Sequence, residues 1–274
     1  MSADTTVVIA CFNYGDYLGE AVASALEQPG GAPHVVVVDD GSTDPATHET
    51  LTRLASDVEI VRQPNRGVCA ARNAGLARVG TPFALVLDAD DRLAPGALPA
   101  MRAALDDAPE LGFAYGWMRF FGAWRGVMRF PGYDPYRLLY RHMIGLSALM
   151  RREVVEATGG FDPAFAHYED WELWVNALAH GWRGVQVPVV TLEYRRHAES
   201  KLALDRARYR DAFRRLRSKH AELYARRGEL ARETGAGPAR RLAYEWFWGR
   251  RPIPGRVERA LHQVRFGRSM QAER

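Results

Sequence analysis

Residues 35–44 read V-V-V-V-D-D-G-S-T-D, and this stretch decides the fold class. Four consecutive valines have no polar face, so we expect a strand that is buried on both sides, as in a parallel sheet. The strand ends in Asp39 and Asp40, which places two carboxylates at its carboxyl end, and Gly41 and Ser42 predict a turn after them. The stretch therefore predicts an α/β protein with polar groups beyond the end of a buried strand.

Strands and helices alternate on both sides of this stretch. Short apolar runs predict strands at residues 7–10, 60–61 and 83–87. Helical spacing and turn residues predict helices over about 16–26, from 45 onward and over 67–78, the first capped by Asp16. This alternation predicts an open, Rossmann-like, mostly parallel sheet with helices on both faces. Ligands bind such sheets beyond the carboxyl ends of the strands.

The chain changes character after residue 115. Aromatic residues dominate 111–150, where we expect strands or a hairpin. A helix over 169–180 and two short strands over 185–190 and 191–195 are predicted next, and an arginine-rich helical pattern begins at 202. We therefore divide the chain into a body, 1–200, and a helical C-terminal extension, 201–274.

Charge and lysine content are unevenly distributed. Lys201 and Lys219 are the only lysines among 37 basic residues, which excludes a P-loop or Schiff-base lysine in the first two thirds of the chain. The net charge is −8 over 1–200 and +12 over 201–274. The basic extension is interpreted either as a contact for an anionic partner or as solvated faces of amphipathic helices.

Cysteines and apolar runs indicate the compartment. Cys11 and Cys69 are too few for a disulfide framework, and their apolar surroundings predict buried thiols. The N-terminus lacks a signal-peptide pattern, and no apolar run is long enough to cross a bilayer. We expect a cytoplasmic protein, and the basic extension also allows peripheral contact with the inner face of the membrane.

A second group of carboxylates, Asp88-Ala89-Asp90-Asp91, follows the strand at 83–87. Carboxylates this close raise one another's pKa unless a cation or several donors face them. Oxygen ligands suit Mg²⁺ or Mn²⁺, which are commonly shared with substrate phosphates. The alternative is a turn and helix cap with solvated acids.

Eight motifs, in order, resemble the inverting glycosyltransferases of family 2, which have the GT-A fold. The first four are V-V-I-A-C-F-N-Y (7–14), A-S-A-L-E-Q (23–28), the stretch 35–44 and N-R-G-V-C-A-A-R-N-A-G-L (65–76). The others are L-D-A-D-D (87–91), G-G-F-D (159–162), Y-E-D-W-E-L-W (168–174) and Y-R-R-H-A-E-S (194–200). The resemblance implies a nucleotide-sugar half over about 1–115 and an acceptor half over about 116–200, and it leaves the extension uncovered.

The resemblance also implies a donor site at the strand ends. Ala10 and Phe12 would line the base pocket, and Asp40 would accept a hydrogen bond from a base N–H. Arg72 would lie toward the diphosphate or ribose, with a surface arginine as the alternative. The implied nucleotide-sugar ligands are Ala10, Phe12, Asn13, Asp39, Asp40, Arg72, Asn73, Asp88 and Ala89.

A metal and a catalytic pair are implied beside this site. Asp90 would bind Mn²⁺ or Mg²⁺ on the diphosphate, with Asp91 as the alternative ligand and His197 completing the metal or phosphate site. Asp170 would be the general base that takes the acceptor's proton, and Glu169 would orient the base or the acceptor. The alternative for this pair is an acidic first turn that stabilises a helix dipole.

The leading hypothesis is a metal-dependent inverting glycosyltransferase that uses a nucleotide-diphosphate sugar, with UDP as the default nucleotide. The acceptor is a saccharide, a lipid-linked glycan or a small molecule, and no nucleic-acid partner is expected. A catalytically silent sugar-nucleotide-binding module is the alternative. A nucleotidyltransferase is less favoured because the turn F-N-Y-G-D (12–16) has no basic residue.

Two groups of aromatic residues complete the sequence predictions. Trp171 and Trp174 are expected in the core rather than as platforms for a sugar. Trp246-Phe247-Trp248, followed by Arg250-Arg251, predicts either an interfacial membrane anchor or a helix packed on the body.

Overall fold

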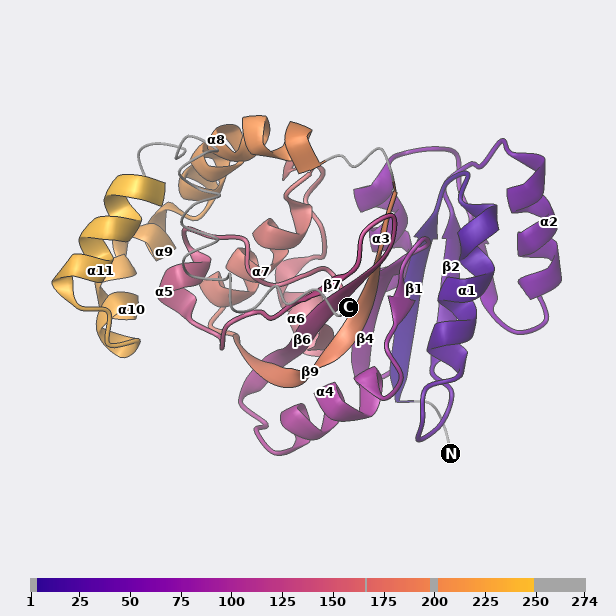
Figure 1. Cartoon of the computed structure of the whole chain (residues 1–274), viewed down its shortest axis with the longest axis horizontal. Coiled ribbons are helices and arrows are strands. Elements are labelled where there is room, and N and C mark those ends of the chain that lie inside the picture. Colours follow the sequence, from indigo (N-terminus) through magenta and orange to yellow (C-terminus); the bar gives the residue numbers. More distant parts are fainter. Residues whose placement is uncertain (1–3, 166, 198–201, 249–274) are drawn as a thin grey trace.

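The computed structural model describes residues 4–165, 167–197 and 202–248. Figure 1 shows a twisted sheet with helices on both faces and a group of C-terminal helices on the left. Within the described residues the sheet has nine strands in the order β3-β2-β1-β4-β8-β6-β9-β5, with β7 paired to β6. The strands are β1 (Thr5–Cys11), β2 (His34–Asp39), β3 (Glu59–Arg62), β4 (Phe83–Asp88), β5 (Arg92–Leu93), β6 (Leu111–Gly122), β7 (Gly126–Met128), β8 (Leu149–Arg151) and β9 (Arg183–Arg196).

The N-terminal half of the sheet is parallel, as predicted. Strand β1 lies between β2 and β4, and β2 pairs with β3, all in the parallel sense. Val35 and Val37 pack into the apolar cluster on one face, whereas Val36 and Val38 pack with Ala71 on the other. The continuous run of valines is therefore explained by helices that cover both faces of β2.

Eleven α-helices lie in the described residues. They are α1 (Gly15–Leu26), α2 (Pro45–Leu54), α3 (Val68–Leu76), α4 (Ala97–Asp106), α5 (Pro135–Leu138), α6 (Arg152–Thr158), α7 (Glu169–Ala179), α8 (Leu202–Lys219), α9 (Ala221–Ala225), α10 (Arg227–Glu233) and α11 (Pro238–Ala243). A 3₁₀ turn (Pro163–Phe165) precedes α7, and a π-helical turn (Tyr244–Trp248) follows α11.

The prediction that Asp16 caps the first helix is wrong. The cap position is Tyr14, and α1 begins at Gly15, whose N–H donates to Thr47 Oγ1 at 2.9 Å.

The second half of the sheet is mixed. Strand β8 is antiparallel to β4 and β6, and β6 is parallel to β9. The predicted hairpin is the antiparallel pair β6–β7. The two short strands expected over 185–195 are one strand, β9, whose pairing with β6 shifts register around Trp117. A β-bulge absorbs such a shift without ending the strand.

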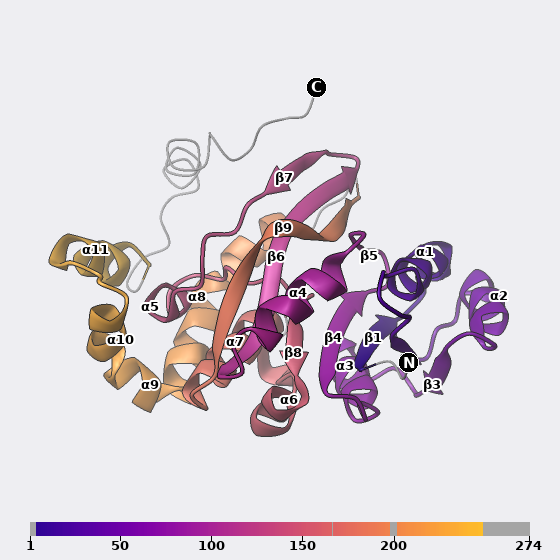
Figure 2. The same cartoon turned by 90° about the horizontal axis from the view of Figure 1, so that it is seen from below.

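The C-terminal helices share the core of the body. Figure 2 shows α8 beside α7, with α9 to α11 continuing away from the sheet. Phe213 of α8 and Tyr224 of α9 belong to the same buried cluster as Trp171 and Tyr140 of the body. Among the described residues, no helix is both long and apolar enough to span a membrane.

Candidate functional site

The aspartates at the end of β2 are held by backbone N–H groups of the neighbouring loops. Asp39 accepts from the Ser42 N–H at 2.9 Å. Asp40 accepts from the N–H groups of Arg66 and Gly67, each at 2.9 Å, and from Gln63 Nε2 at 2.6 Å. Since a carboxylate has about four acceptor positions, one remains on Asp40. The predicted hydrogen bond from a nucleobase N–H would therefore take the one acceptor position of Asp40 that is still free.

The residues predicted beside the base lie at the end of β1. Ala10 is paired in register with Asp88, and the Phe12 side chain is exposed. Asn13 has a left-handed backbone (φ 56°), and its Oδ1 accepts from the N–H groups of Thr43 and Asp44. Asn13 therefore joins the loop after β1 to the loop after β2. Ala89 is buried in the apolar cluster under the sheet.

Arg72 of α3 joins the two halves of the site. Its Nη2 contacts Asp88 Oδ1 at 2.7 Å, and its Nη1 contacts Glu169 Oε1 at 2.7 Å. Burial acts to lower the pKa of Arg72, but the two carboxylates outweigh that effect and raise it. At 5% exposure the residue is not a surface arginine, and both of its terminal nitrogens are bound to carboxylates rather than pointing freely toward a diphosphate.

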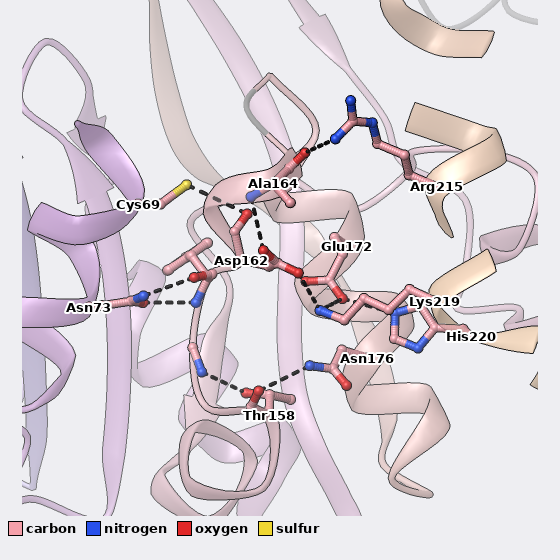
Figure 3. A network of polar contacts seen from close by, with 12 residues as sticks. Cys69, Asn73, Thr158, Asp162, Ala164, Glu172, Asn176, Arg215, Lys219 and His220 are labelled. Atoms are coloured by element: carbon pink, nitrogen blue, oxygen red, sulfur yellow. Dashed lines mark hydrogen bonds and ion pairs between the residues drawn. The ribbon is translucent and has the colours of Figure 1, made fainter. Parts of the chain in front are cut away.

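Asn73 has a structural partner. Its Nδ2 donates to the Phe161 carbonyl and its Oδ1 accepts the Phe161 N–H, both at 2.8 Å (Figure 3). A Cβ on the adjacent Gly160 (φ 83°) would lie 2.5 Å from Asn73 Oδ1, so this loop requires glycine there. The amide of Asn73 docks the loop of the G-G-F-D motif onto α3, and its contact with the donor stays a prediction.

The acidic turn after β4 separates the two candidate metal ligands. Asp91 is 3% exposed and accepts from the Arg195 N–H at 2.8 Å, so it faces β9. Asp90 is more open, and its Oδ2 lies 2.8 Å from His197 Nε2. Burial and the nearby Asp88 charge raise the pKa of Asp90, and the same causes, with Asp90, raise the pKa of Asp91 well above its usual value.

A divalent cation fits this turn through few protein ligands. Within the described ranges no group of three or more His, Cys, Asp or Glu side chains is placed to hold a metal. Asp90 and His197 nevertheless offer an oxygen and a nitrogen side by side, and Mg²⁺ commonly takes one or two carboxylates and completes its shell with phosphate and water. A cation would also relieve the crowding that raises the pKa of these acids. Geometry favours Asp90 over Asp91 for this role.

The first turn of α7 carries the candidate base. Asp170 Oδ1 accepts from the Trp171 N–H, and Asp170 Oδ2 lies 2.8 Å from His142 Nε2. Burial acts to raise the pKa of Asp170, but the charge and hydrogen bond of His142, together with the charge of Arg72, outweigh that effect and lower the pKa.

Trp171 and Trp174 are fully buried, which confirms their assignment to the core. His142 was missed by sequence reasoning, because it lies in the aromatic region 111–150 and belongs to no motif.

A polar network fastens α7 to the C-terminal helices (Figure 3). Glu172 is 0% exposed, and its Oε1 lies 2.8 Å from both Lys219 Nζ and His220 Nε2. Lys219 also contacts Asp162 at 2.7 Å, and Arg215 donates to the Ala164 carbonyl at 3.2 Å. Two residues after the candidate base, α7 is therefore anchored by Lys219, His220 and Arg215, which the sequence motifs do not include.

The two thiols take no part in the site. Cys11 and Cys69 are both buried and unpaired, as predicted. Burial raises the pKa of each thiol to about 11, so neither is a ready nucleophile at neutral pH.

Comparisons with known proteins agree on one family. The family model "Glycosyl transferase family 2" matches residues 6–159, and "Glycosyltransferase like family 2" matches 136–217. The succinoglycan biosynthesis protein ExoU of Rhizobium meliloti is 34% identical over 202 residues, which cover 66% of this chain and 58% of that protein. The chain thus spans less than two thirds of the length of this relative.

Solved structures of low sequence identity share the fold. S. aureus TarS 1–349 in complex with UDP-GlcNAc has a TM-score of 0.61 at 19% identity, over 74% of this chain and 61% of that chain. The mannosyltransferase PcManGT from Pyrobaculum calidifontis, in complex with GDP-Man and Mn²⁺, has a TM-score of 0.60 at 20% identity, over 97% and 81%. The protein belongs to glycosyl transferase family 2 and has the GT-A fold of its members.

Proposed function

We propose that this glycosyltransferase moves a sugar from a nucleotide-diphosphate donor to an acceptor hydroxyl with inversion. The observation that carries the proposal is the double ion pair of Arg72. One guanidinium contacts Asp88 of the donor half and Glu169, the neighbour of Asp170, at 2.7 Å each. The donor strand ends and the candidate base are thereby held together across two halves of the chain.

Asp170 serves as the general base in this proposal. Its lowered pKa keeps the carboxylate ionised at neutral pH, ready to accept the proton of the acceptor hydroxyl as the oxygen attacks C1 of the sugar. Glu169 is bound to Arg72 and orients the start of α7. Attack from the face opposite the leaving diphosphate gives inversion in a single displacement.

Asp90 and His197 would hold Mn²⁺ or Mg²⁺ beside the diphosphate. When bound, such a cation neutralises the charge that develops on the leaving nucleoside diphosphate. The proposed nucleoside-binding residues lie at the same edge of the sheet, at the ends of β1 and β2. They are Ala10, Phe12, Asp39 and Asp40.

The donor nucleotide is proposed to be UDP, and GDP is the competing candidate. TarS was solved with UDP-GlcNAc and PcManGT with GDP-Man, so both probes are justified. A thermal-shift titration of UDP and GDP with Mn²⁺ identifies the nucleotide, because a ligand that binds the native state raises the melting temperature.

Catalysis is tested by release of nucleotide from UDP-GlcNAc or GDP-mannose. A silent binding module would show a thermal shift without release. Asp170→Asn should bind the nucleotide with an unchanged shift and lose release by about 10²-fold or more. Full activity in Asp170→Asn would contradict the assignment of the base.

A contact with anionic membranes is proposed for the end of the described chain. Leu242 and Trp246 lie four residues apart and are 67% and 54% exposed, beside Arg241. The predicted Arg250 and Arg251 lie outside the described residues. Apolar side chains flanked by arginine suit the interface of an anionic bilayer. Co-sedimentation with vesicles that contain phosphatidylglycerol should fall in the variant Leu242→Ser/Trp246→Ser, and equal binding would reject the contact.

A further inference from the structure

His142 lies on the segment between α5 and β8, and its imidazole meets the carboxylate of Asp170. Nε2 is 2.8 Å from Asp170 Oδ2 and 3.0 Å from the Ile144 carbonyl. Both partners accept hydrogen bonds when Asp170 is ionised, so Nε2 must carry the proton. This fixes one tautomer of the neutral ring and leaves Nδ1 as the atom that gains a proton when the ring is charged.

The imidazole is held in place from several sides. Its ring stacks on Trp171 at 6.5 Å and 25°, and it meets the ring of Tyr168 edge-on at 6.3 Å. The side chain is 35% exposed, so one part of the ring borders solvent. The imidazole is thus oriented toward Asp170 and not buried as a core residue.

Three consecutive carbonyls hold the segment that carries His142. Trp171 Nε1 donates to the Leu138 carbonyl at 2.7 Å, Tyr224 Oη to the Leu139 carbonyl at 2.6 Å, and Tyr209 Oη to the Tyr140 carbonyl at 2.7 Å. The donors come from α7, α9 and α8. Helix α7 and two of the C-terminal helices, α8 and α9, therefore fix the path of the backbone just before His142.

We propose that His142 is the positioning residue of Asp170: its Nε2–H holds Oδ2 so that the remaining lone pairs of the carboxylate face the acceptor hydroxyl. The inference rests on the proposed role of Asp170 as base. The Trp171 N–H holds Oδ1, and His142 holds Oδ2, so the carboxylate is fixed at both oxygens. A base whose rotation is prevented in this way reacts without reorganisation.

The charges around the pair agree with this role. Burial acts to lower the pKa of His142, but Asp170, with a smaller effect of Glu169, raises it. Two charged neighbours, Glu169 and Arg72, act on the pair through their charge. Two titratable rings lie nearby: Tyr168 packs on the imidazole, and Tyr209 packs on Trp171. Arg141 precedes His142 in the sequence. An imidazolium facing Asp170 keeps the base ionised to lower pH.

The test uses His142→Phe, which retains a ring against Trp171 and removes the donor. We expect kcat for nucleotide release from UDP-GlcNAc or GDP-mannose to fall about 10- to 100-fold with little change in KM. The acid limb of the pH profile should move to higher pH, because Asp170 loses the group that lowers its pKa. His34→Phe is the matched control, since it removes a histidine–carboxylate pair (His34–Glu59, 3.3 Å) remote from the site.

A second measurement is independent of turnover. NMR titration of the histidine ring signals, with His142 assigned through His142→Phe, should give a pKa for His142 above the usual value that falls in Asp170→Asn. An unchanged His142 pKa in Asp170→Asn, or a His142→Phe variant with wild-type kcat and pH profile, overturns the positioning role. Full activity in Asp170→Asn would instead overturn the proposed base, so the two failures are distinct.

Discussion

The buried carboxylate of Glu172 provides the strongest prediction about stability. Glu172 is fully buried on α7, and the two side chains that face it in the described structure, Lys219 and His220, both contact Oε1 at 2.8 Å. Its Oε2 is buried without a hydrogen-bond partner among the described residues. The carboxylate is therefore stable in its position only while at least one of these two hydrogen-bond donors remains.

The magnitudes follow from the exposure of each partner. Lys219 is 36% exposed and also contacts Asp162, so we expect Lys219→Met to lower the free energy of unfolding by only about 1 kcal/mol. The His220 side chain is 5% exposed, and His220→Phe should cost about 1.5–3 kcal/mol, as for a hydrogen bond to a charged group. The double variant leaves a buried charge without a cation, which should cost about 3–5 kcal/mol.

Urea unfolding of the full chain, followed by far-UV circular dichroism, measures these losses. The control is Arg214→Met on α8, the helix that carries Lys219. The pair of Arg214 with Asp211 is exposed, so its loss should change the free energy of unfolding by less than about 0.5 kcal/mol. Adding Glu172→Leu to the double variant should restore most of the lost stability, since it removes the unpaired charge itself. A double variant within about 1 kcal/mol of the wild type, or no recovery on adding Glu172→Leu, would refute the reasoning.

Three further predictions follow from the site and the packing. Chelation with EDTA should abolish nucleotide release and Mn²⁺ or Mg²⁺ should restore it, because the acids beside the proposed diphosphate site need a cation; full activity in chelator would contradict the role of Asp90. Gly75→Ala should lower the free energy of unfolding by about 1–3 kcal/mol, because the new Cβ would lie 2.2 Å from Val8 Cγ1. Gly19→Ala in α1, where the new Cβ meets open space, should raise the free energy of unfolding by about 0.4–1 kcal/mol. Urea unfolding measures both changes, and two changes of the same sign would contradict the packing. Because the pKa of His142 is raised in the folded protein, its ion pair with Asp170 contributes its full stability below about pH 6.5, and this contribution is lost as the pH rises through the raised pKa. His142→Phe should therefore lower the free energy of unfolding more at about pH 5.5 than at about pH 9. Equal losses at the two pH values would contradict the ion pair.

The strand ends of the donor half were predictable from the sequence. Buried runs such as 35–38 and 83–87 determine a parallel sheet by their lack of a polar face, and the acids that follow them must then meet at one edge. The helix expected from residue 45 onward is α2, which begins at Pro45. These features depend on residues close together in the sequence, so local pattern is sufficient.

The pairings inside the site were not predictable in the same way. Arg72 and Glu169 are 97 positions apart, and His142 reaches Asp170 from a segment without a motif. Which carboxylate an arginine meets depends on how α3, α7 and the sheet pack, and periodicity carries no information about that packing. The proposed choice of Asp90 over Asp91 likewise rests on a contact between distant residues, because Asp91 accepts the Arg195 N–H next to the antiparallel pair β5–β9.

The charges of the C-terminal extension are partly used in its packing against the body, which neither interpretation of its basic charge in the sequence analysis included. Its charge is partly neutralised inside the molecule, because Lys219 faces Glu172 and Arg240 pairs with Asp134. Its aromatic donors, Tyr209 and Tyr224, hold the backbone that leads to His142. The motifs named in the sequence analysis end at residue 200, whereas a family model matches through residue 217 and the contacts that support the proposed base continue through α9. An acidic body and a basic extension complement each other across this interface, so the division of charge along the sequence is in part the electrostatic signature of a single packed unit.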